Sequence, residues 1–383
     1  MTDSIGGENM KKNTHRAWAE IDLNTIERNF QNIQRQVGDC GVLCVIKANA
    51  YGHGSVPVAK RLQKAGAAYF GVATVPEAVE LREQGVTLPI LILGYVDEAD
   101  AALVARYRIT AAVYDFETAE MLSAAAMEEG EEIRVHFKLD TGMSRLGFPA
   151  HHLEETAGEI LRISKLPGLR PDGIFTHFAV SDEVDGAAFT AMQQARFEAV
   201  CEMLEARGLH LAVRHCANSG AVLQHPGSYM NMVRAGIILY GYYPDRAIPR
   251  TLGLRPAMTL KARIVQVHTV DAGSTVSYGR TYEAARDTRL AVLSIGYADG
   301  YLRGRPGHAS VLLGGRVVPV VGRICMDMCM AELPDGLAVR RGDEAIIFGP
   351  EGVTAEDVAE SVDTITYEVL CAVSSRVPRI YIG

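Results

Sequence analysis

Residues 42–47 read VLCVIK, a short apolar run rich in β-branched residues that ends in a lysine. Such runs are typical of strands buried on both faces of a parallel sheet. Seven similar runs follow, separated by helical patterns. The strands are therefore predicted at 42–47, 69–74, 89–93, 109–114, 134–139, 173–178, 211–216 and 233–240. Eight strands alternating with helices over about 200 residues predict an α/β fold with a (β/α)8 TIM-like barrel.

Helix boundaries between these strands follow ordinary end signals. The segment PEAVELREQG begins with Pro76, which favours the first turn of a helix, and FETAEMLSAAAMEEG ends in a glycine suited to a C-cap. The segments between the strands are therefore predicted to be helices, as parallel βα units require.

The pattern changes after Pro244 to strand-like runs that alternate apolar and polar residues, with glycines at the turns. This predicts a second, mostly antiparallel β domain. We expect a barrel over residues 16–245 and the β domain over 246–383. The run at 17–23 has the same strand character, so it is a candidate to pair with the second domain.

Composition excludes several classes of function. The 383-residue chain carries a formal charge of −8 and shows no cluster of Lys and Arg, which argues against nucleic acid as a partner. The polar N-terminus lacks the apolar core of a signal peptide, and no apolar run reaches the roughly 18 residues that cross a bilayer. We expect a cytoplasmic protein, although "SIGGEN" before Met10 leaves open whether the chain is complete or part of a larger protein.

Seven cysteines are scattered along the chain. Cys325 and Cys329 are four residues apart, but no second Cys or His pair stands near them to complete a zinc site. They are interpreted as packing residues, and no metal is predicted.

Polar residues gather where the predicted barrel strands end. Catalytic groups of a (β/α)8 barrel lie at the carboxyl ends of its strands. The residues at or just beyond those ends are Lys47, Lys138, Asp140, Arg145, His177, Asn218, Ser219, Arg234 and Gly236. Each alone could be a solvated loop residue, but together they favour a site on one rim.

Lys47 suits Schiff-base chemistry, because partial burial in a barrel mouth lowers the pKa of a lysine toward that of a usable nucleophile. Pyridoxal 5'-phosphate is the obvious carbonyl partner. Its phosphate needs backbone N–H donors, which ANSG (217–220) and RAGI (234–237) could offer, with hydroxyls from Ser219 and Tyr51. The residues alone make this plausible but not unique.

Eight motifs, in order, give the chain a resemblance to a known family. They are VIKANAYGHG (45–54), KLDTGMSRLG (138–147), THFA (176–179), ANSG, VRAGIILYG (233–241), VSYGRTY (276–282), IGYADGY (295–301) and GRICMD (322–327). Together they resemble the alanine racemases, pyridoxal-phosphate isomerases built from a barrel and a C-terminal β domain. The resemblance runs from about residue 16 to the C-terminus, and the first motif alone is highly specific.

The resemblance implies roles for individual residues. Lys47 would hold the cofactor as a Schiff base and act as one catalytic base, and Tyr278 of the partner subunit would be the other. The active sites would therefore be shared across a homodimer. Cofactor contacts are implied for Lys47, Tyr51, His177, Asn218, Ser219, Arg234, Gly236 and Ile237. Substrate contacts are implied for Arg145, Met326, Tyr297, Asp327 and Ser375. For Tyr297 and Asp327, a purely structural role is an even alternative.

Two positions leave alternatives open. Lys138 matches a lysine that is carbamylated in some relatives, or it is a plain lysine in a salt bridge. Near the C-terminus the family usually has a tyrosine before RVPR, where this chain has Ser375. Loss of the ring would open space for a substrate larger and more polar than alanine, such as serine, unless a neighbouring residue fills the gap.

The leading interpretation is an isomerase that interconverts L- and D-alanine and supplies D-alanine for peptidoglycan. Serine racemisation, or both activities, is the alternative. A decarboxylase of basic amino acids would share the architecture but would need no second base, so Tyr278 argues against it. A non-catalytic pyridoxal-phosphate carrier would lack the second domain.

Overall fold

The structure, a computed structural model, describes residues 14–383, which divide into two compact units. The barrel unit comprises Ile21–Met258, Thr366–Cys371 and Tyr381–Gly383. The β unit comprises Thr259–Ile365, Ala372–Ile380 and the described residues up to Glu20. The stretch used above to argue against a signal peptide lies partly in residues 1–13, outside the described residues. No helix within residues 14–383 has the length and apolar character needed to span a membrane.

Eight parallel strands form the barrel, as predicted. They are β2 (Gly41–Val45), β3 (Tyr69–Val72), β4 (Ile90–Ile92), β5 (Thr110–Val113), β6 (Ile133–Asp140), β8 (Leu169–Phe175), β9 (Val213–His215) and β10 (Met232–Ala235). They pair in sequence order, and β10 returns to pair with β2, so that Met232 lies opposite Gly41. Between β9 and β10 the amide of Arg234 donates to the carbonyl of Ala217 (2.9 Å), which leaves the ring nearly closed.

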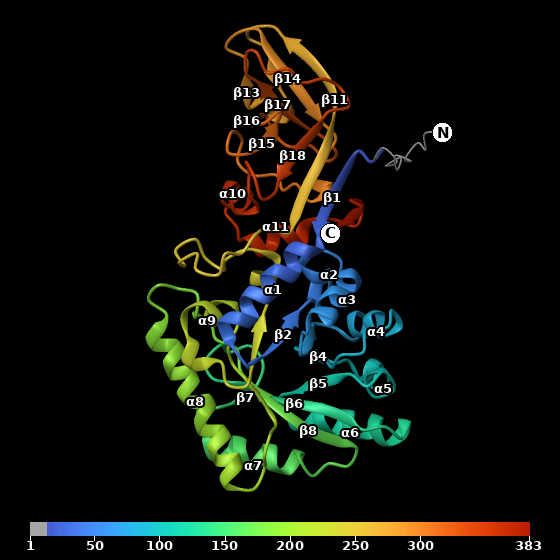
Figure 1. The fold of residues 1–383 in the computed structure, drawn as a ribbon, viewed down its shortest axis with the longest axis vertical. Coiled ribbons are helices and arrows are strands. Elements are labelled where there is room, and N and C mark those ends of the chain that lie inside the picture. The colour runs from blue at the N-terminus through green and yellow to red at the C-terminus, as the bar shows by residue number, and fades with distance from the viewer. Residues whose placement is uncertain (1–13) are drawn as a thin grey trace, which may run out of the picture. The chain divides into compact units, whose positions relative to one another are not determined.

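Helices follow the strands around the outside of the barrel (Figure 1). They are α1 (Leu23–Val37), α3 (Ser55–Ala65), α4 (Val75–Glu83), α5 (Ala101–Arg106), α6 (Phe116–Glu129), α7 (Leu153–Ile163), α8 (Ala187–Ala206) and α9 (Ser219–Gln224). The predicted end signals are confirmed. Pro76 lies in the first turn of α4, where Thr74 and Glu77 form a capping box, and Gly130 ends α6 with a left-handed φ.

The last barrel strand is shorter than predicted. The run 233–240 was expected to be one strand, but β10 ends at Ala235 and a 3-10 turn, η3 (Ile237–Tyr240), follows. The backbone turns at Gly236, whose amide donates to Oγ of Ser219 (2.9 Å) instead of continuing a ladder. This turn brings two loops together at the rim.

The β unit contains an antiparallel sheet with the order β14-β17-β16-β15-β18-β11-β1-β19. Its strands are β11 (Met258–Val270), β14 (Thr288–Leu293), β15 (Ser310–Leu313), β16 (Arg316–Val321), β17 (Cys329–Leu333), β18 (Glu344–Phe348), β1 (Ala17–Asp22) and β19 (Arg379–Ile382). A further pairing of β14 with β11 joins six of them into a ring. Val276, Leu290 and Val321 form a buried cluster at this sheet.

Two helices interrupt the region that was expected to contain only strands, α10 (Ala355–Ser361) and α11 (Thr366–Ala372). Residues Thr366–Cys371 of α11 cluster with the barrel unit and not with the β unit. Each compact unit therefore has segments on both sides of residue 245.

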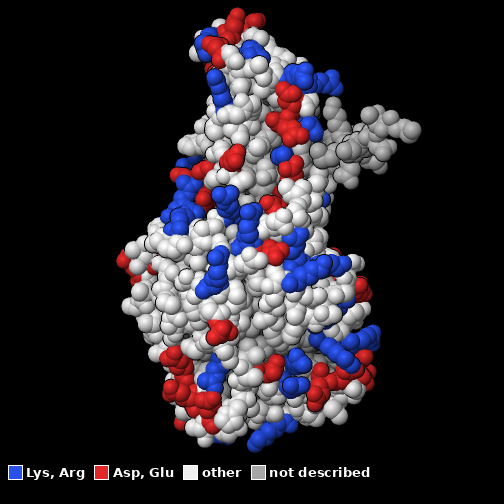
Figure 2. Space-filling model, viewed as in Figure 1, with Lys and Arg blue, Asp and Glu red and all other residues white. Residues whose placement is uncertain are grey.

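Acidic and basic side chains are interspersed over the face in view in Figure 2, without an extended basic patch there. This mixture suits the formal charge of −8.

Candidate active site

A cavity of about 520 Å³ opens at the carboxyl ends of the barrel strands. The nine site residues that the sequence predicted in the barrel, together with Lys138, line this cavity. They are Lys47, Tyr51, Lys138, Arg145, His177, Asn218, Ser219, Arg234, Gly236 and Ile237. The structure thus brings together side chains that are spread over nearly 200 residues of sequence.

Lys47 directly precedes an uncommon backbone conformation. Residues 48–51 all have φ between 51° and 53°, a left-handed turn built from non-glycine residues. Each such residue costs roughly 1–2 kcal/mol relative to a right-handed turn, and such strain persists only where neighbours hold it. The sequence ANAYG eases it through two small alanines, an asparagine that tolerates this region, and Gly52.

Specific hydrogen bonds hold this turn. The amide of Ala48 donates to Oε1 of Glu77 (2.7 Å), and Oδ1 of Asn49 accepts from the amide of Ser55 (2.9 Å). The amide of Gly52 donates to the carbonyl of Ala48 (3.0 Å). Because the turn is fixed on both sides, the cavity receives Lys47 and Tyr51 in defined positions.

The environment of Lys47 favours its neutral form. Burial lowers the pKa of this lysine, and the nearby cation Arg145 lowers it further, while Glu77 acts in the opposite direction. A lowered pKa makes the amine a better nucleophile and proton acceptor near neutral pH.

A cradle bordered by two hydroxyl groups lies at the junction of α9 and η3. Oγ of Ser219 accepts from the amide of Gly236, and a Cβ at Gly236 would lie 2.9 Å from the hydroxyl oxygen of Tyr51 and 3.4 Å from Oγ of Ser219. Only glycine leaves this space open. Asn218 supports the cradle as the N-cap of α9, since Oδ1 accepts from the amide of Ala221 (3.0 Å) and from Oγ of Ser181 (2.6 Å).

Arg234 is buried and fully engaged. It donates to the carbonyls of Thr176 (2.7 Å), His215 (2.9 Å) and Cys216 (3.0 Å), and to Nδ1 of His177 (3.3 Å). Burial lowers the pKa of Arg234 to about 10, so it remains a cation at neutral pH. Burial and the surrounding cations hold the pKa of His177 well below its usual value, so His177 is neutral.

Two histidines that the sequence analysis did not select lie behind Arg234. His215 and His136 are fully buried, with Nε2 of His215 3.0 Å from Nδ1 of His136, and Nδ1 of His215 faces Nη1 of Arg234. Each occupies a strand position that reads as ordinary core. The available signal was their polarity, because a barrel interior is normally filled by branched apolar side chains.

Lys138 and Arg145 also line this cavity. Nζ of Lys138 donates to the carbonyl of Leu93 (3.3 Å), and burial together with Arg145, Arg234 and Lys47 lowers the pKa of Lys138 to about 8. The loop that carries Arg145 is shaped by Asp140, whose Oδ1 accepts from the amides of Gly142 (2.9 Å) and Ser144 (3.0 Å).

Helix α11 adds two residues to the cavity that the sequence analysis also missed, Tyr367 and Cys371. The ring of Tyr367 lies 5.9 Å from that of Tyr51, and the ring of Tyr240 lies 4.9 Å from that of Tyr51, tilted by 33°. Burial raises the pKa of both the Tyr367 hydroxyl and the Cys371 thiol, so both stay protonated.

The other predicted site residues lie in loops of the β unit. Tyr278, Tyr297 and Met326 are exposed by 65%, 38% and 53% in the single chain, and Ser375 is also exposed. Two of these loops touch directly, because the amides of Tyr297 and Ala298 donate to the carbonyls of Cys325 and Met326 (both 3.0 Å). The loop of Tyr278 joins them through Ser277, whose hydroxyl donates to the carbonyl of Arg323 (2.6 Å).

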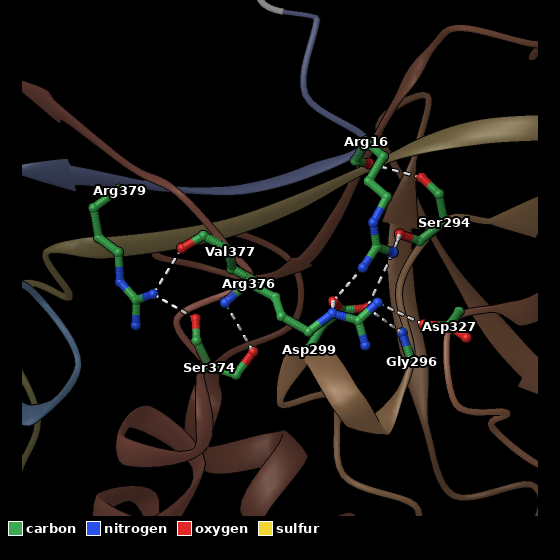
Figure 3. Close-up of polar contacts among 9 residues, drawn as sticks. All are labelled: Arg16, Ser294, Gly296, Asp299, Asp327, Ser374, Arg376, Val377 and Arg379. Atoms are coloured by element: carbon green, nitrogen blue, oxygen red, sulfur yellow. Dashed lines mark hydrogen bonds and ion pairs between the residues drawn. The ribbon is translucent and has the colours of Figure 1, made fainter.

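An ion-pair cluster fixes the segment around Ser375 (Figure 3). Arg376 pairs with Asp327 (2.7 Å) and lies 3.6 Å from the fully buried Asp299, which also pairs with Arg16 (2.5 Å). The amide of Ser374 donates to the carbonyl of Asp299 (3.1 Å). The structure therefore gathers Tyr278, Tyr297, Met326, Asp327 and Ser375 into one loop cluster, with Asp327 in a structural ion pair.

Known proteins resemble the chain over nearly its whole length. The family described as "Alanine racemase, N-terminal domain" matches residues 21–244, and "Alanine racemase, C-terminal domain" matches residues 257–381. An alanine racemase of Desulforamulus reducens is 45% identical over 368 residues, covering 96% of this chain and 99% of the relative. One of Clostridium perfringens is 44% identical, covering 95% of each. A solved alanine racemase of Clostridium difficile 630 superimposes with a TM-score of 0.93 at 42% identity, covering 97% of both chains.

Proposed function

Because the chain belongs to the alanine racemase family and is an isomerase, we propose that Lys47 and Tyr278 are its two catalytic bases, acting with pyridoxal 5'-phosphate on L- and D-alanine. The observation that carries this proposal is the convergence of Lys47, Arg234 and the Ser219–Gly236 cradle in one cavity. We place the reaction in the cytoplasm, where D-alanine would be supplied for peptidoglycan.

The residues in the cavity fit pyridoxal phosphate. The space above Gly236, which a Cβ would fill, is bordered by two hydroxyls and would take the phosphate. Lys47, Lys138, Arg145 and Arg234 make the wall strongly basic, which favours a multiply charged anion there. When bound, the cofactor would supply an electron sink for negative charge at the substrate Cα.

Racemisation needs a proton acceptor on one face of the substrate and a proton donor on the other. The lowered pKa of Lys47 suits it to exchange a proton at its ε-amino group. Tyr278 would act from the opposite face, with its hydroxyl supplied by the partner subunit. Tyr278 is exposed by 65% and Met326 by 53% in the single chain, which supports a surface that a second copy covers.

Substrate orientation is assigned to Arg145 and to the backbone of Met326. A guanidinium binds a carboxylate through two parallel hydrogen bonds, and Asp140 gives the Arg145 loop its shape. Arg234 would face the pyridine nitrogen. Because an arginine does not give up its proton, that nitrogen would stay unprotonated, which restrains side reactions.

A heterodimer of Lys47→Ala and Tyr278→Phe chains tests both bases together. If Tyr278 is donated by the partner, one site of the heterodimer keeps both bases and the other has neither. The purified heterodimer, isolated with two different affinity tags, should therefore show about half of the wild-type rate, while both homodimers are nearly inactive. An inactive heterodimer would contradict donation by the partner, and full activity of the Tyr278→Phe homodimer would refute the role of Tyr278.

Exchange with deuterated water separates the two faces. In Tyr278→Phe, Lys47 should still exchange the Cα proton of one enantiomer with solvent without inverting it. Loss of exchange for both enantiomers would mean that Tyr278 is needed for more than one proton transfer.

Serine racemisation is the second candidate, carried by the absence of a ring at Ser375. The Arg376 ion pairs fix the backbone of this segment, so the space left by the missing ring is not expected to close by loop collapse. We expect wild type to turn over L-serine and Ser375→Tyr to lower kcat/KM for L-serine about tenfold or more relative to L-alanine. Negligible serine turnover in wild type, unchanged in Ser375→Tyr, would leave alanine as the sole substrate.

A further inference from the structure

A second cavity lies at the opposite end of the barrel, where the strands begin. Its volume is about 480 Å³, close to that of the cofactor cavity. It is lined by Arg82, Thr87, Pro89, Arg108, Thr110, Gly130, Glu131, Glu132, Arg134 and Arg170. These residues precede or open four consecutive strands, β4, β5, β6 and β8. No step proposed above uses them.

Arg134 points into the barrel axis. Side chains alternate along a strand, so Arg134, His136 and Lys138 of β6 share one face. His136 packs against His215 inside the barrel, and Lys138 lines the cofactor cavity, so this face is the interior one. Arg134 therefore forms the first interior layer at the amino end.

Arg170 stands beside Arg134. The two residues are register partners on the parallel strands β6 and β8, so their side chains leave the same face of the sheet next to each other. Like charges in neighbouring positions repel, and an anion bound between these two exposed side chains would relieve that repulsion.

The cavity carries an excess of positive charge. Its lining has four arginines and two glutamates, an excess of two positive charges in a chain whose formal charge is −8. Among the described residues, the only ion pair between two lining residues joins Arg108 to Glu131 (3.2 Å). This ion pair involves neither Arg134 nor Arg170.

Arg82 and a buried hydroxyl complete the wall. The Arg82 guanidinium donates to the carbonyls of Val86 (2.9 Å), Leu88 (2.7 Å) and Tyr107 (3.1 Å), which holds two loops of this rim in place without a carboxylate. The hydroxyl of Thr110, buried at the floor, lies 3.0 Å from that of Tyr69. The cavity therefore has a polar floor and a rim on which Arg82 is held in place.

We propose that this cavity binds a small, multiply charged oxyanion, either a phosphate ester or a polycarboxylate, between Arg134 and Arg170. Guanidinium groups present planar donor forks that match both phosphate and carboxylate oxygens. A phosphate ester and a polycarboxylate would be bound by the same guanidinium donors, and the experiment below distinguishes between them.

The test uses the cofactor-loaded enzyme, so that the phosphate cradle at the other end is filled. Inorganic pyrophosphate and citrate are titrated separately by calorimetry at constant ionic strength. The test variant is Arg134→Gln/Arg170→Gln. The matched control, Arg28→Gln/Arg286→Gln, also removes two positive charges, from side chains that are 62% and 67% exposed elsewhere. Cofactor absorbance is followed throughout to show that the cradle stays occupied.

We expect saturable binding of one anion per chain in wild type and in the control, and an affinity about tenfold or more weaker in Arg134→Gln/Arg170→Gln. Preference for pyrophosphate identifies a phosphate ester, and preference for citrate a polycarboxylate. Binding of neither anion to wild type, or equal binding to both double variants, overturns the proposal. If the test variant does not fold, Arg134→Lys/Arg170→Lys keeps the charge but loses the donor forks, and unweakened binding of both anions by this variant overturns the proposal equally.

Discussion

Nη1 of Arg234 lies 3.0 Å from Nδ1 of His215, and an arginine can only donate. His215 therefore accepts at Nδ1 and carries its proton on Nε2, which lies 3.0 Å from Nδ1 of His136. His136 must accept there, so its own proton is also on Nε2. Burial lowers the pKa of His136 to about 3 and that of His215 well below its usual value, so both rings are neutral.

Neutron diffraction from a crystal exchanged into deuterated water tests these assignments. Deuterium is expected on Nε2 of both His215 and His136. His53 is an internal control with the opposite tautomer, because its Nδ1 lies 3.1 Å and 2.9 Å from the carbonyls of Ala50 and Tyr51 and must donate. Deuterium on Nδ1 of His215 would contradict the hydrogen-bond direction inferred from Arg234.

Acid should destabilise the folded protein through its buried histidines. His136, His177 and His215 stay neutral when folded but bind protons when unfolded, below the ordinary histidine pKa of about 6.5. The unfolded state then binds more protons, so the free energy of unfolding falls as the pH falls. Below pH 6.5 the free energy of unfolding is expected to fall by about 1.4 kcal/mol per pH unit for each histidine. Well above that pH neither state binds the proton, so the histidines no longer make stability depend on pH.

Urea unfolding of the holoenzyme between pH 7 and pH 4.5 measures this slope. His136→Asn removes one titrating ring and should reduce the slope by about one histidine's share, whereas His308→Asn, at an exposed position, should leave it unchanged. A slope that does not change in His136→Asn would mean that His136 is protonated in the folded state.

The left-handed turn after Lys47 predicts an unusual response to glycine. Ala48→Gly should leave the free energy of unfolding unchanged or raise it by up to about 1 kcal/mol, because glycine adopts φ near 52° without strain. The matched control is Ala124→Gly at an exposed position of the right-handed helix α6, expected to lose about 1 kcal/mol. Equal losses in the two variants would show that residue 48 is not left-handed in solution.

Lys138 should bind carbon dioxide in a pH-dependent manner. A carbamate forms only from the neutral amine, and with a pKa of about 8 that form is roughly one tenth of the total at pH 7 and half at pH 8. At a fixed concentration of dissolved CO2, carbamate occupancy should therefore rise between pH 6 and pH 9. A ¹³C NMR signal with labelled bicarbonate measures it, and Lys138→Arg serves as the blank. No signal in wild type at pH 9 would favour a plain lysine.

Much of the barrel could be predicted because its strands are continuous apolar runs. VLCVIK and its seven successors carry the signal locally, and the structure confirms all eight. The predicted end of the last barrel strand was wrong, because the turn at Gly236 depends on Ser219, which lies seventeen residues away. The sequence also did not predict that Thr366–Cys371 belongs to the barrel unit, since no local pattern indicates on which unit a short helix packs.

The candidate site was predictable where residues sit at strand ends, which is why Lys47, Arg234 and the other barrel residues were found from position alone. His136 and His215 were missed because their hydrogen bonds are made with residues on other strands. In the sequence, a single histidine within a strand looks like an ordinary core residue. The same limit hid the neighbouring charges of Arg134 and Arg170, which become a pair only through the register of β6 and β8.

The line of hydrogen bonds from Arg234 through His215 to His136 also determines where protons cannot travel. Every N–H in it points away from Arg234, and passing a proton along it would require reversing each bond and an arginine able to accept. This line of side chains therefore does not carry protons between Arg234 and His136. If Lys47 exchanges protons as proposed, this line of side chains does not deliver them, and an anion in the amino-end cavity would not exchange protons with Lys47 along it.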